Sequence, residues 1–388
     1  TPMPVPEPAG TTLAVGATAV RIQIDDVAVR DAFDVAFSSL ASEGEPEHEA
    51  TITPTDHGFA LRIDGEDAYS GSDASNVVDV FVSWCNREAI ESRIDAVNLH
   101  AAGVVAPGTD RAVVIPAAPG SGKTTTAAIA CGQGWGYLSD EMVSVESDGT
   151  LAGYAKPLTF KTGTKDLIDS VDYGRWDLSS RQNRWYLPAS YLGGYVVDTA
   201  VAHALVFVSY EPDKPTDASE LGPAEAALEL VTNCQDLLDD QGNALTVLAT
   251  LASNTHAYRL DQSNTDAVME VLDNVADAPP VKPSPVTPLT RSTPGSDVVG
   301  PCINEDVVGA VVADGVIIHR PSTRGIALLD PLAGAIWQLL DGSTTEAGLV
   351  QELAEAFDHP REEIEADVFA LLDQLRTNEF LSDAGVAD

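Results

Sequence analysis

The feature that most constrains this chain is a glycine-rich turn between an apolar stretch and a run of small residues. The turn reads Ala117-Ala118-Pro119-Gly120-Ser121-Gly122-Lys123-Thr124. Residues 111–116 before it predict a buried strand, and residues 125–130 after it predict a helix of small side chains. At such a junction, backbone N–H groups and a helix N-terminus can face phosphate oxygens. The segment therefore predicts a phosphate-binding loop, with an accidental Gly-rich turn as the alternative.

A phosphate-binding loop implies a nucleoside triphosphate, and we expect ATP with Mg²⁺. Lys123 would neutralise the β- and γ-phosphates, and the Thr124 hydroxyl would bind the Mg²⁺. The residues expected to contact the nucleotide are Ala118, Pro119, Gly120, Ser121, Gly122, Lys123, Thr124 and Thr125.

The chain is strongly acidic without being disordered in bulk. It holds 60 Asp and Glu against 21 Lys and Arg, for a net charge of −39, yet 44% of its residues are hydrophobic. Such a surface favours a salt-adapted cytosol, because high ionic strength screens self-repulsion. An ordinary acidic cytosolic protein is the alternative. No basic stripe is present to meet phosphates, so we expect no nucleic-acid or membrane partner.

If the charge reflects salt adaptation, the melting temperature should climb steeply from about 0.1 M to about 3 M KCl, since screening weakens repulsion among carboxylates. Differential scanning calorimetry across that range measures it. A flat melting temperature would favour the ordinary acidic protein.

The cysteines and the first residues indicate a reducing compartment. Cys85, Cys131, Cys234 and Cys302 are scattered singly without zinc-ligand spacing, and read as small core residues. The first residues lack a signal-peptide pattern, and no apolar run reaches the length of a membrane span. We expect a soluble, cytoplasmic protein. The sequence leaves homo-oligomer formation open.

Composition along the chain divides it into five parts. We expect a flexible lead over 1–16, an α/β portion over 17–96, a catalytic region over 97–276, a proline-rich linker over 277–298, and a small domain over 299–388. In the small domain, a hairpin about Asp314-Gly315 and a strand over 325–329 precede helices over 331–340, 345–357 and 361–377. Their apolar stripes, including Trp337 and Phe357, are expected in the core.

Two acidic residues and a histidine accompany the loop. Asp140 and Glu141 come only one helix and one strand after Lys123, and His100 lies on a strand-like segment one hairpin before the loop. A His, a phosphate loop and an early acidic pair in this order resemble the HPr kinase/phosphorylase family. The segments 154–161, 184–188 and 221–226 resemble further parts of HPr-kinase-related proteins. The Leu-Glu-Ile-Arg-Gly segment of the bacterial enzymes has no counterpart, so the resemblance does not extend to HPr as the substrate.

The resemblance implies an α/β P-loop fold, shared with phosphoenolpyruvate carboxykinases, and in-line phosphoryl transfer. It assigns catalytic roles to His100, Lys123, Asp140 and Glu141, and metal binding to Thr124, Asp140 and Glu141. Asp140 would accept a hydroxyl proton or hold Mg²⁺, Glu141 would take the other role, and His100 would orient or stabilise the γ-phosphoryl group. His100 could instead be a core histidine. Further candidates for charge stabilisation, each equally a surface cation, are Lys156, Lys161, Arg181 and Arg184.

The C-terminal region, 299–381, resembles PqqD-like domains, which recognise leader peptides of ribosomal peptide-modifying systems. The resemblance rests on its three-strand, three-helix order, on residues 330–342 and on residues 371–375 before Phe380. It implies a small α+β, winged-helix-like domain that captures a peptide as an added strand at the edge over 325–329, beside the helix over 361–377. A domain used only for dimerisation or stability is the alternative.

Together these expectations describe an ATP-dependent Ser/Thr-type kinase acting on a peptide or protein that residues 299–388 deliver, in ribosomal peptide modification. Tethering would raise the substrate concentration at the active site. One alternative is a nucleotide-dependent regulatory or hydrolytic switch, with Asp140 on magnesium and Glu141 on water. Another is a non-catalytic peptide carrier.

Overall fold

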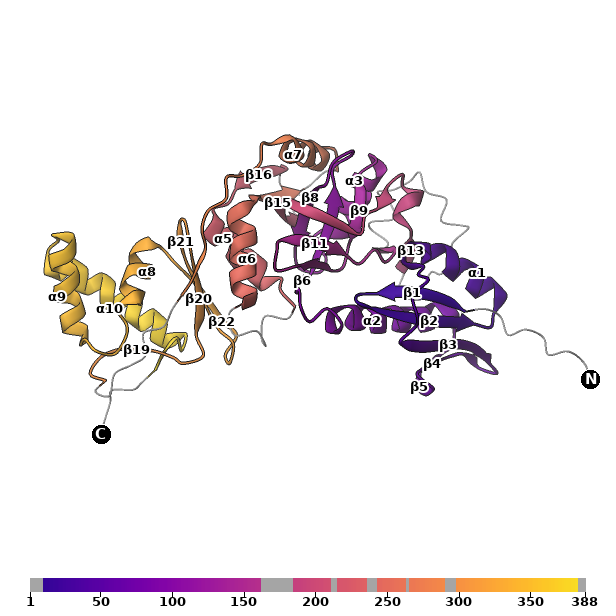
Figure 1. Cartoon of the computed structure of the whole chain (residues 1–388), viewed down its shortest axis with the longest axis horizontal. Helices are drawn as coiled ribbons and strands as arrows, with labels where there is room; N and C mark the ends of the chain where they lie inside the picture. The colour runs from indigo at the N-terminus through magenta and orange to yellow at the C-terminus, as the bar shows by residue number, and fades with distance from the viewer. Residues whose placement is uncertain are drawn as a thin grey trace, which may run out of the picture. The chain divides into compact units, whose positions relative to one another are not determined.

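The computed structural model describes residues 10–161, 184–210, 215–235, 243–262, 265–289 and 298–382. The chain separates into two compact units, each assembled from two stretches of sequence (Figure 1). The first contains residues 1–219 and 258–280, and the second contains residues 220–257 and 281–388. Both mix helices and strands, so the fold is α/β as expected.

The first unit begins with a five-stranded sheet in the order β1-β2-β3-β4-β5, whose members are β1 (Thr11–Val15), β2 (Thr18–Ile24), β3 (His48–Thr55), β4 (Gly58–Ile63) and β5 (Glu66–Gly71). Only β2 and β3 pair in parallel. Asp26 caps α1 (Val27–Ala36), which a 3₁₀ turn (Ser38–Leu40) follows, and Asp73 caps α2 (Ala74–Glu91). Both helices supply side chains to the core of this sheet.

The prediction of a flexible lead over 1–16 was wrong for its second half. Residues 11–15 form the edge strand β1, in which Leu13 and Val15 are fully buried. Apolar side chains at alternate positions place both residues on the core face of the sheet. Residues 1–9 lie outside the described part of the chain.

A larger sheet occupies the rest of the first unit, in the order β14-β9-β7-β8-β15-β11-β10-β6, with β17 pairing to β15 and β16 to β17. Its strands are β6 (Val97–Leu99), β7 (Ala101–Val105), β8 (Arg111–Pro116), β9 (Gly136–Ser139), β10 (Val143–Val145), β11 (Thr150–Gly153), β14 (Tyr195–Val196), β15 (Thr199–Tyr210), β16 (Asp217–Glu220) and β17 (His256–Gln262). A separate pair joins β12 (Leu158–Lys161) to β13 (Arg184–Leu187), and a 3₁₀ turn covers Ala189–Tyr191.

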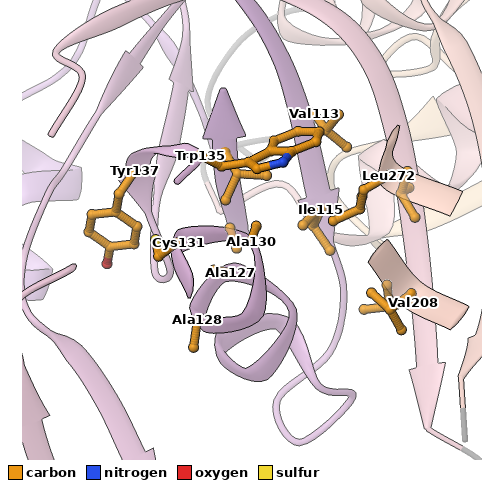
Figure 2. Close-up of a cluster of buried hydrophobic side chains, with 14 of the residues drawn as sticks. Val113, Ile115, Ala127, Ala128, Ala130, Cys131, Trp135, Tyr137, Val208 and Leu272 are labelled. Atoms are coloured by element: carbon orange, nitrogen blue, oxygen red, sulfur yellow. The ribbon is translucent and has the colours of Figure 1, made fainter. Parts of the chain in front are cut away.

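Helices α3 (Lys123–Gly132) and α7 (Thr265–Asp277) pack on this sheet. Figure 2 shows Val113 and Ile115 of β8 in one cluster with Ala127 of α3 and Leu272 of α7. The small side chains that α3 contributes to this cluster, Ala127, Ala128 and Ala130, let the helix lie close to the strands. The strand, loop and helix expected around residues 111–130 are therefore all present.

In the second unit a four-stranded sheet has the order β18-β20-β21-β22, formed by β18 (Thr287–Pro288), β20 (Val308–Val312), β21 (Gly315–Arg320) and β22 (Gly325–Leu329). One face is covered by α8 (Pro331–Gln338), α9 (Glu346–Phe357) and α10 (Arg361–Thr377). A small pair of strands joins β19 (Cys302–Ile303) to β23 (Leu381–Ser382). The expected hairpin, third strand and three helices are present, with α9 capped by Thr345. Trp337 is buried, but Phe357 is 44% exposed and thus lies outside the core.

The other face of the same sheet is covered by two helices that precede the proline-rich segment. Helix α6 (Asn243–Asn254) packs against β20, and α5 (Pro223–Thr232) packs against β21 and β22. Asp314, in the β20–β21 turn, accepts a hydrogen bond of 3.0 Å from the backbone N–H of Ala224 at the start of α5. A Cβ built at Gly315 would lie 3.2 Å from the Ala224 Cβ, so glycine permits this close approach.

This packing differs from the expected catalytic region over 97–276 and linker over 277–298. Residues 220–257 cluster with the C-terminal unit, because the apolar sides of α5 and α6 bury against the β20–β22 face. Within the proline-rich segment, β18 pairs with β20, so part of the expected linker belongs to a sheet. Local sequence patterns could not show which sheet these helices would cover.

Candidate functional site

The topology of the first unit brings three sequence candidates, the glycine-rich loop, Asp140 and His100, to the same end of three neighbouring strands in the large sheet. Strand β7 lies between β8 and β9 and is antiparallel to both, so β8 and β9 run in the same direction. The loop follows β8 and Asp140 follows β9, so both lie at the end of the strands where β7 begins. His100 directly precedes the first residue of β7 and lies at the same end. The pairing of Ala101 with Pro116 confirms this alignment.

The glycine-rich loop turns directly into α3. Gly120 and Gly122 have φ of 90° and 104°, in the left-handed region that glycine adopts without strain. Gly122 is the N-cap of α3 and offers no capping side chain to the first turn of the helix. The positive end of the helix dipole at this position favours an anionic group.

Lys123 is 6% exposed, and its ammonium group folds back onto the loop. Nζ donates to the carbonyl oxygen of Ala117 and, at 3.0 Å, to that of Ala118. Burial lowers the pKa of Lys123 to about 8, while the carboxylates of Glu141 and Asp140 oppose the shift. The side chain therefore stays mainly protonated at neutral pH, and its positive charge lies at the loop.

Asp140 is 4% exposed and accepts hydrogen bonds on both carboxylate oxygens. Oδ2 accepts from the Thr124 hydroxyl at 3.0 Å and from the Thr159 backbone N–H at 3.3 Å. Oδ1 lies 2.7 Å from Lys156 Nζ and 3.0 Å from the Tyr137 hydroxyl. Burial first, and Asp140 second, raise the pKa of Tyr137 well above its usual value, so this phenol remains a donor. The loop helix and the acidic strand end are thus joined through Thr124 and Asp140.

Lys156 has a different place from the one expected of a charge-stabilising cation. Its side chain is 1% exposed, and Nζ donates to Asp140, to the Thr159 hydroxyl at 3.0 Å and to the Pro157 carbonyl at 3.3 Å. All three ammonium hydrogens therefore have acceptors within the protein. Lys161 is exposed at the end of β12, Arg184 is half-buried at the start of β13, and Arg181 lies outside the described residues.

His100 lies beside Glu141 and is held by its backbone. Nδ1 donates to the Glu141 carbonyl oxygen at 3.1 Å and lies 3.7 Å from Glu141 Oε1. Burial first, and Lys123 second, lower the pKa of His100, whereas Glu141 opposes the shift. The ring is therefore neutral at pH 7, with the proton on Nδ1 and Nε2 as the acceptor.

The structure brings His100, Lys123, Thr124, Asp140 and Glu141 into one site, together with two residues that sequence reasoning did not select. Tyr137 and Thr159 hold Asp140, yet each occupies an ordinary position within a strand. Their roles depend on β12 reaching the end of β9, which no local pattern reports. The signal in the sequence for this part of the site is the resemblance of segment 154–161 to HPr-kinase-related proteins.

The donors at this site suit a magnesium nucleotide. The Thr124 hydroxyl gives its proton to Asp140, so its oxygen lone pairs remain for a cation. Mg²⁺ prefers oxygen ligands and usually takes one or two from protein, with phosphates and waters completing the set. Within the described residues, no three His, Cys, Asp or Glu side chains form a metal-binding group. The residues present therefore fit a cation that is brought by a phosphate ligand.

A second candidate site is the free edge of the C-terminal sheet. β22 is the last strand of that sheet among the described residues and pairs only with β21. In the hairpin, Val312 and Gly315 close the two-residue turn, so the backbone groups of Gly315 face β20. Along β21 the N–H and C=O groups then face β20 and β22 at alternate residues, and those of Ile318 face β22. Ile318 pairs with Ala327, whose backbone groups therefore face β21. The N–H and C=O groups of Ile326 and Leu328 face the open edge.

Comparison with known proteins identifies a domain within the C-terminal unit. Residues 315–381 match the family model described as Coenzyme PQQ synthesis protein D (PqqD), so the chain carries a PqqD domain there. A solved structure of TbiB1 in complex with the TbiA(beta) leader peptide is 28% identical, covers 22% of this chain and 99% of that chain, and has a TM-score of 0.20. A search of curated proteins finds no match to the chain. Among the described residues, no helix is both long and apolar enough to cross a membrane.

Proposed function

We propose that the chain is an ATP-dependent kinase whose PqqD domain captures the peptide or protein that it phosphorylates, in ribosomal peptide modification. The observation that carries the proposal is that the loop, Lys123 and the acidic pair meet at one end of strands β7, β8 and β9. The transferred group would pass to a Ser or Thr hydroxyl, the acceptor that the resemblance to HPr kinases favours.

The loop geometry supports the nucleotide half of the proposal. The first turn of α3 has no capping side chain, and the loop before it contains two glycines in the left-handed conformation, so backbone N–H groups are available to phosphate oxygens. The buried Lys123 ammonium group adds positive charge. The Thr124 hydroxyl is positioned by Asp140 and would hold the magnesium ion of the nucleotide. When bound, that ion would neutralise charge on the β- and γ-phosphates.

The open edge of β22 supports the peptide half. An extended peptide can add to this edge through the backbone groups of Ile326 and Leu328. The PqqD match covers β21, β22 and the three helices behind them. A kinase that holds its substrate in this way raises the local concentration of acceptor hydroxyl groups.

A hydrolytic switch remains the second candidate, and one observation favours it. Glu141 follows Asp140 directly and lies beside a neutral imidazole, an arrangement that could orient a water molecule as readily as a peptide hydroxyl. The products separate the two proposals, because a switch releases inorganic phosphate and a kinase forms a phosphopeptide.

Replacing Ile326 by proline should weaken peptide capture about tenfold, because the edge then lacks one main-chain donor. Ile326→Val keeps that donor and should bind as wild type does. Fluorescence anisotropy with labelled peptides, taken from short reading frames encoded beside this chain, measures both affinities. The register also implies that proline at Ala327 would break a bond to β21 and would test sheet stability instead.

The protein used in the peptide-binding experiment must include α5 and α6. Residues 299–388 alone would leave the second face of the sheet without its covering helices, including the side that buries Ile317. The full chain is therefore the proper reagent. Equal affinity of Ile326→Pro and wild type for every bound peptide would exclude strand addition at β22.

A further inference from the structure

The two adjacent carboxylates of the site have opposite surroundings. Asp140 is buried, and its two oxygens accept from Thr124, Lys156 and Thr159, while the single Tyr137 hydroxyl hydrogen is shared between Asp140 Oδ1 at 3.0 Å and the Lys156 carbonyl oxygen at 2.9 Å. Its charge is balanced by an ammonium group at 2.7 Å. Because the carboxylate is buried and both of its oxygens accept from groups of the protein, Asp140 offers no exposed acceptor to an incoming group.

Glu141 has its backbone fixed and its side chain free. Its N–H donates to Ser139 Oγ at 3.0 Å, and its carbonyl oxygen accepts from His100. The carboxylate is 31% exposed, and the two nearby nitrogen atoms, Nδ1 of the neutral His100 ring and Nζ of Lys156, lie at 3.7 and 3.8 Å, beyond hydrogen-bond distance. This carboxylate therefore retains acceptor positions on the open side of the site.

We infer that these carboxylates divide the work: Asp140 is a positioning residue for Thr124 and the first turn of α3, and Glu141 is the carboxylate that contacts the reacting groups. The inference rests on the proposed nucleotide site. It adds that Asp140 acts through Thr124, whose hydroxyl it orients, and does not itself touch the acceptor.

The two conservative variants should fail in different ways. Asp140→Asn removes the charge that balances Lys156, so it should lower the melting temperature and weaken MgATP binding about tenfold, with turnover at saturating MgATP reduced less than tenfold. Glu141→Gln should leave the melting temperature unchanged and the MgATP affinity within about twofold of wild type. It should cut turnover by about 100-fold, as expected of a group at the reacting atoms. Glu146→Gln, a half-exposed glutamate paired with Arg93, is the matched control and should change neither.

Calorimetric titration with MgATP, thermal unfolding and the rate of ADP formation in the presence of acceptor peptides provide the three readouts. The inference is overturned if Asp140→Asn keeps wild-type stability and affinity, or if Glu141→Gln keeps turnover within about threefold. If wild type forms ADP and inorganic phosphate but no phosphopeptide, the kinase proposal fails, while the same split between affinity and turnover still decides the inference. A wild-type protein that binds no MgATP overturns both.

Discussion

Lys156→Met should destabilise the protein by about 3–5 kcal/mol, the cost of leaving a buried charge without its partner. The Lys156 and Asp140 side chains are each 1% exposed, and their 2.7 Å contact lies among hydrogen bonds that saturate both groups. Methionine fills a similar volume but supplies no positive charge, so the buried carboxylate remains uncompensated. Urea unfolding followed by circular dichroism measures the loss.

Two controls separate this effect from general damage. Arg21→Met breaks an exposed ion pair with Glu49 and should cost at most about 1 kcal/mol. The double variant Asp140→Asn with Lys156→Met removes both charges and should regain part of the lost stability. If Lys156→Met costs no more than Arg21→Met, the buried pair does not hold this site together.

Lys123→Ala should weaken MgATP binding about 100-fold, because the phosphates lose a charge-assisted donor worth roughly 3 kcal/mol. Lys123 is the buried cation of the loop, and its ammonium group donates to loop carbonyl oxygens. Phosphate oxygens bound in the loop would replace those carbonyls as acceptors. Isothermal titration calorimetry gives the two affinities. Lys282→Ala removes an exposed lysine from the other unit and should bind as wild type does.

The predicted stability of Lys123→Ala differs from that of Lys156→Met. Among the described residues, the Lys123 ammonium group donates to loop carbonyls and to no carboxylate, so its loss leaves no buried carboxylate unpaired, and the folded state should lose little stability. Unchanged MgATP affinity in a well-folded Lys123→Ala protein would remove the loop from the proposed nucleotide site.

Local patterns in the sequence were enough for the elements that carry both sites. The β8, loop and α3 unit follows from an apolar run, two glycines and a small-residue helix, and α10 begins and ends where its apolar stripe predicted. In contrast, the neighbourhood of His100 and Asp140 depends on β7 running antiparallel between β8 and β9. The family resemblance assigned these residues to one site, but it gave no strand order, and residue periodicity does not report one.

Two features depended on contacts between distant segments and were missed for that reason. Lys156 was a candidate for charge stabilisation, or equally a surface cation, and its pairing with Asp140 was not predicted because its burial depends on how β12 and the end of β9 meet. The residues of α5 and α6 were placed with the catalytic region over 97–276 because they precede the proline-rich segment, yet both helices cover the C-terminal sheet. The apolar pattern of residues 223–232 identified a side that must be buried without identifying its partner, whereas no local pattern marked Lys156 as buried.

The most direct test of the account is phosphoryl transfer from γ-labelled ATP to a peptide that the full chain captures. We expect label on a Ser or Thr of that peptide with wild-type protein and essentially none with Glu141→Gln. Ile326→Pro should slow transfer to the captured peptide about tenfold, while a short acceptor peptide that does not reach β22 should be unaffected. Release of all label as inorganic phosphate, with every captured peptide left unlabelled, would contradict the kinase account and leave the hydrolytic switch as the better description.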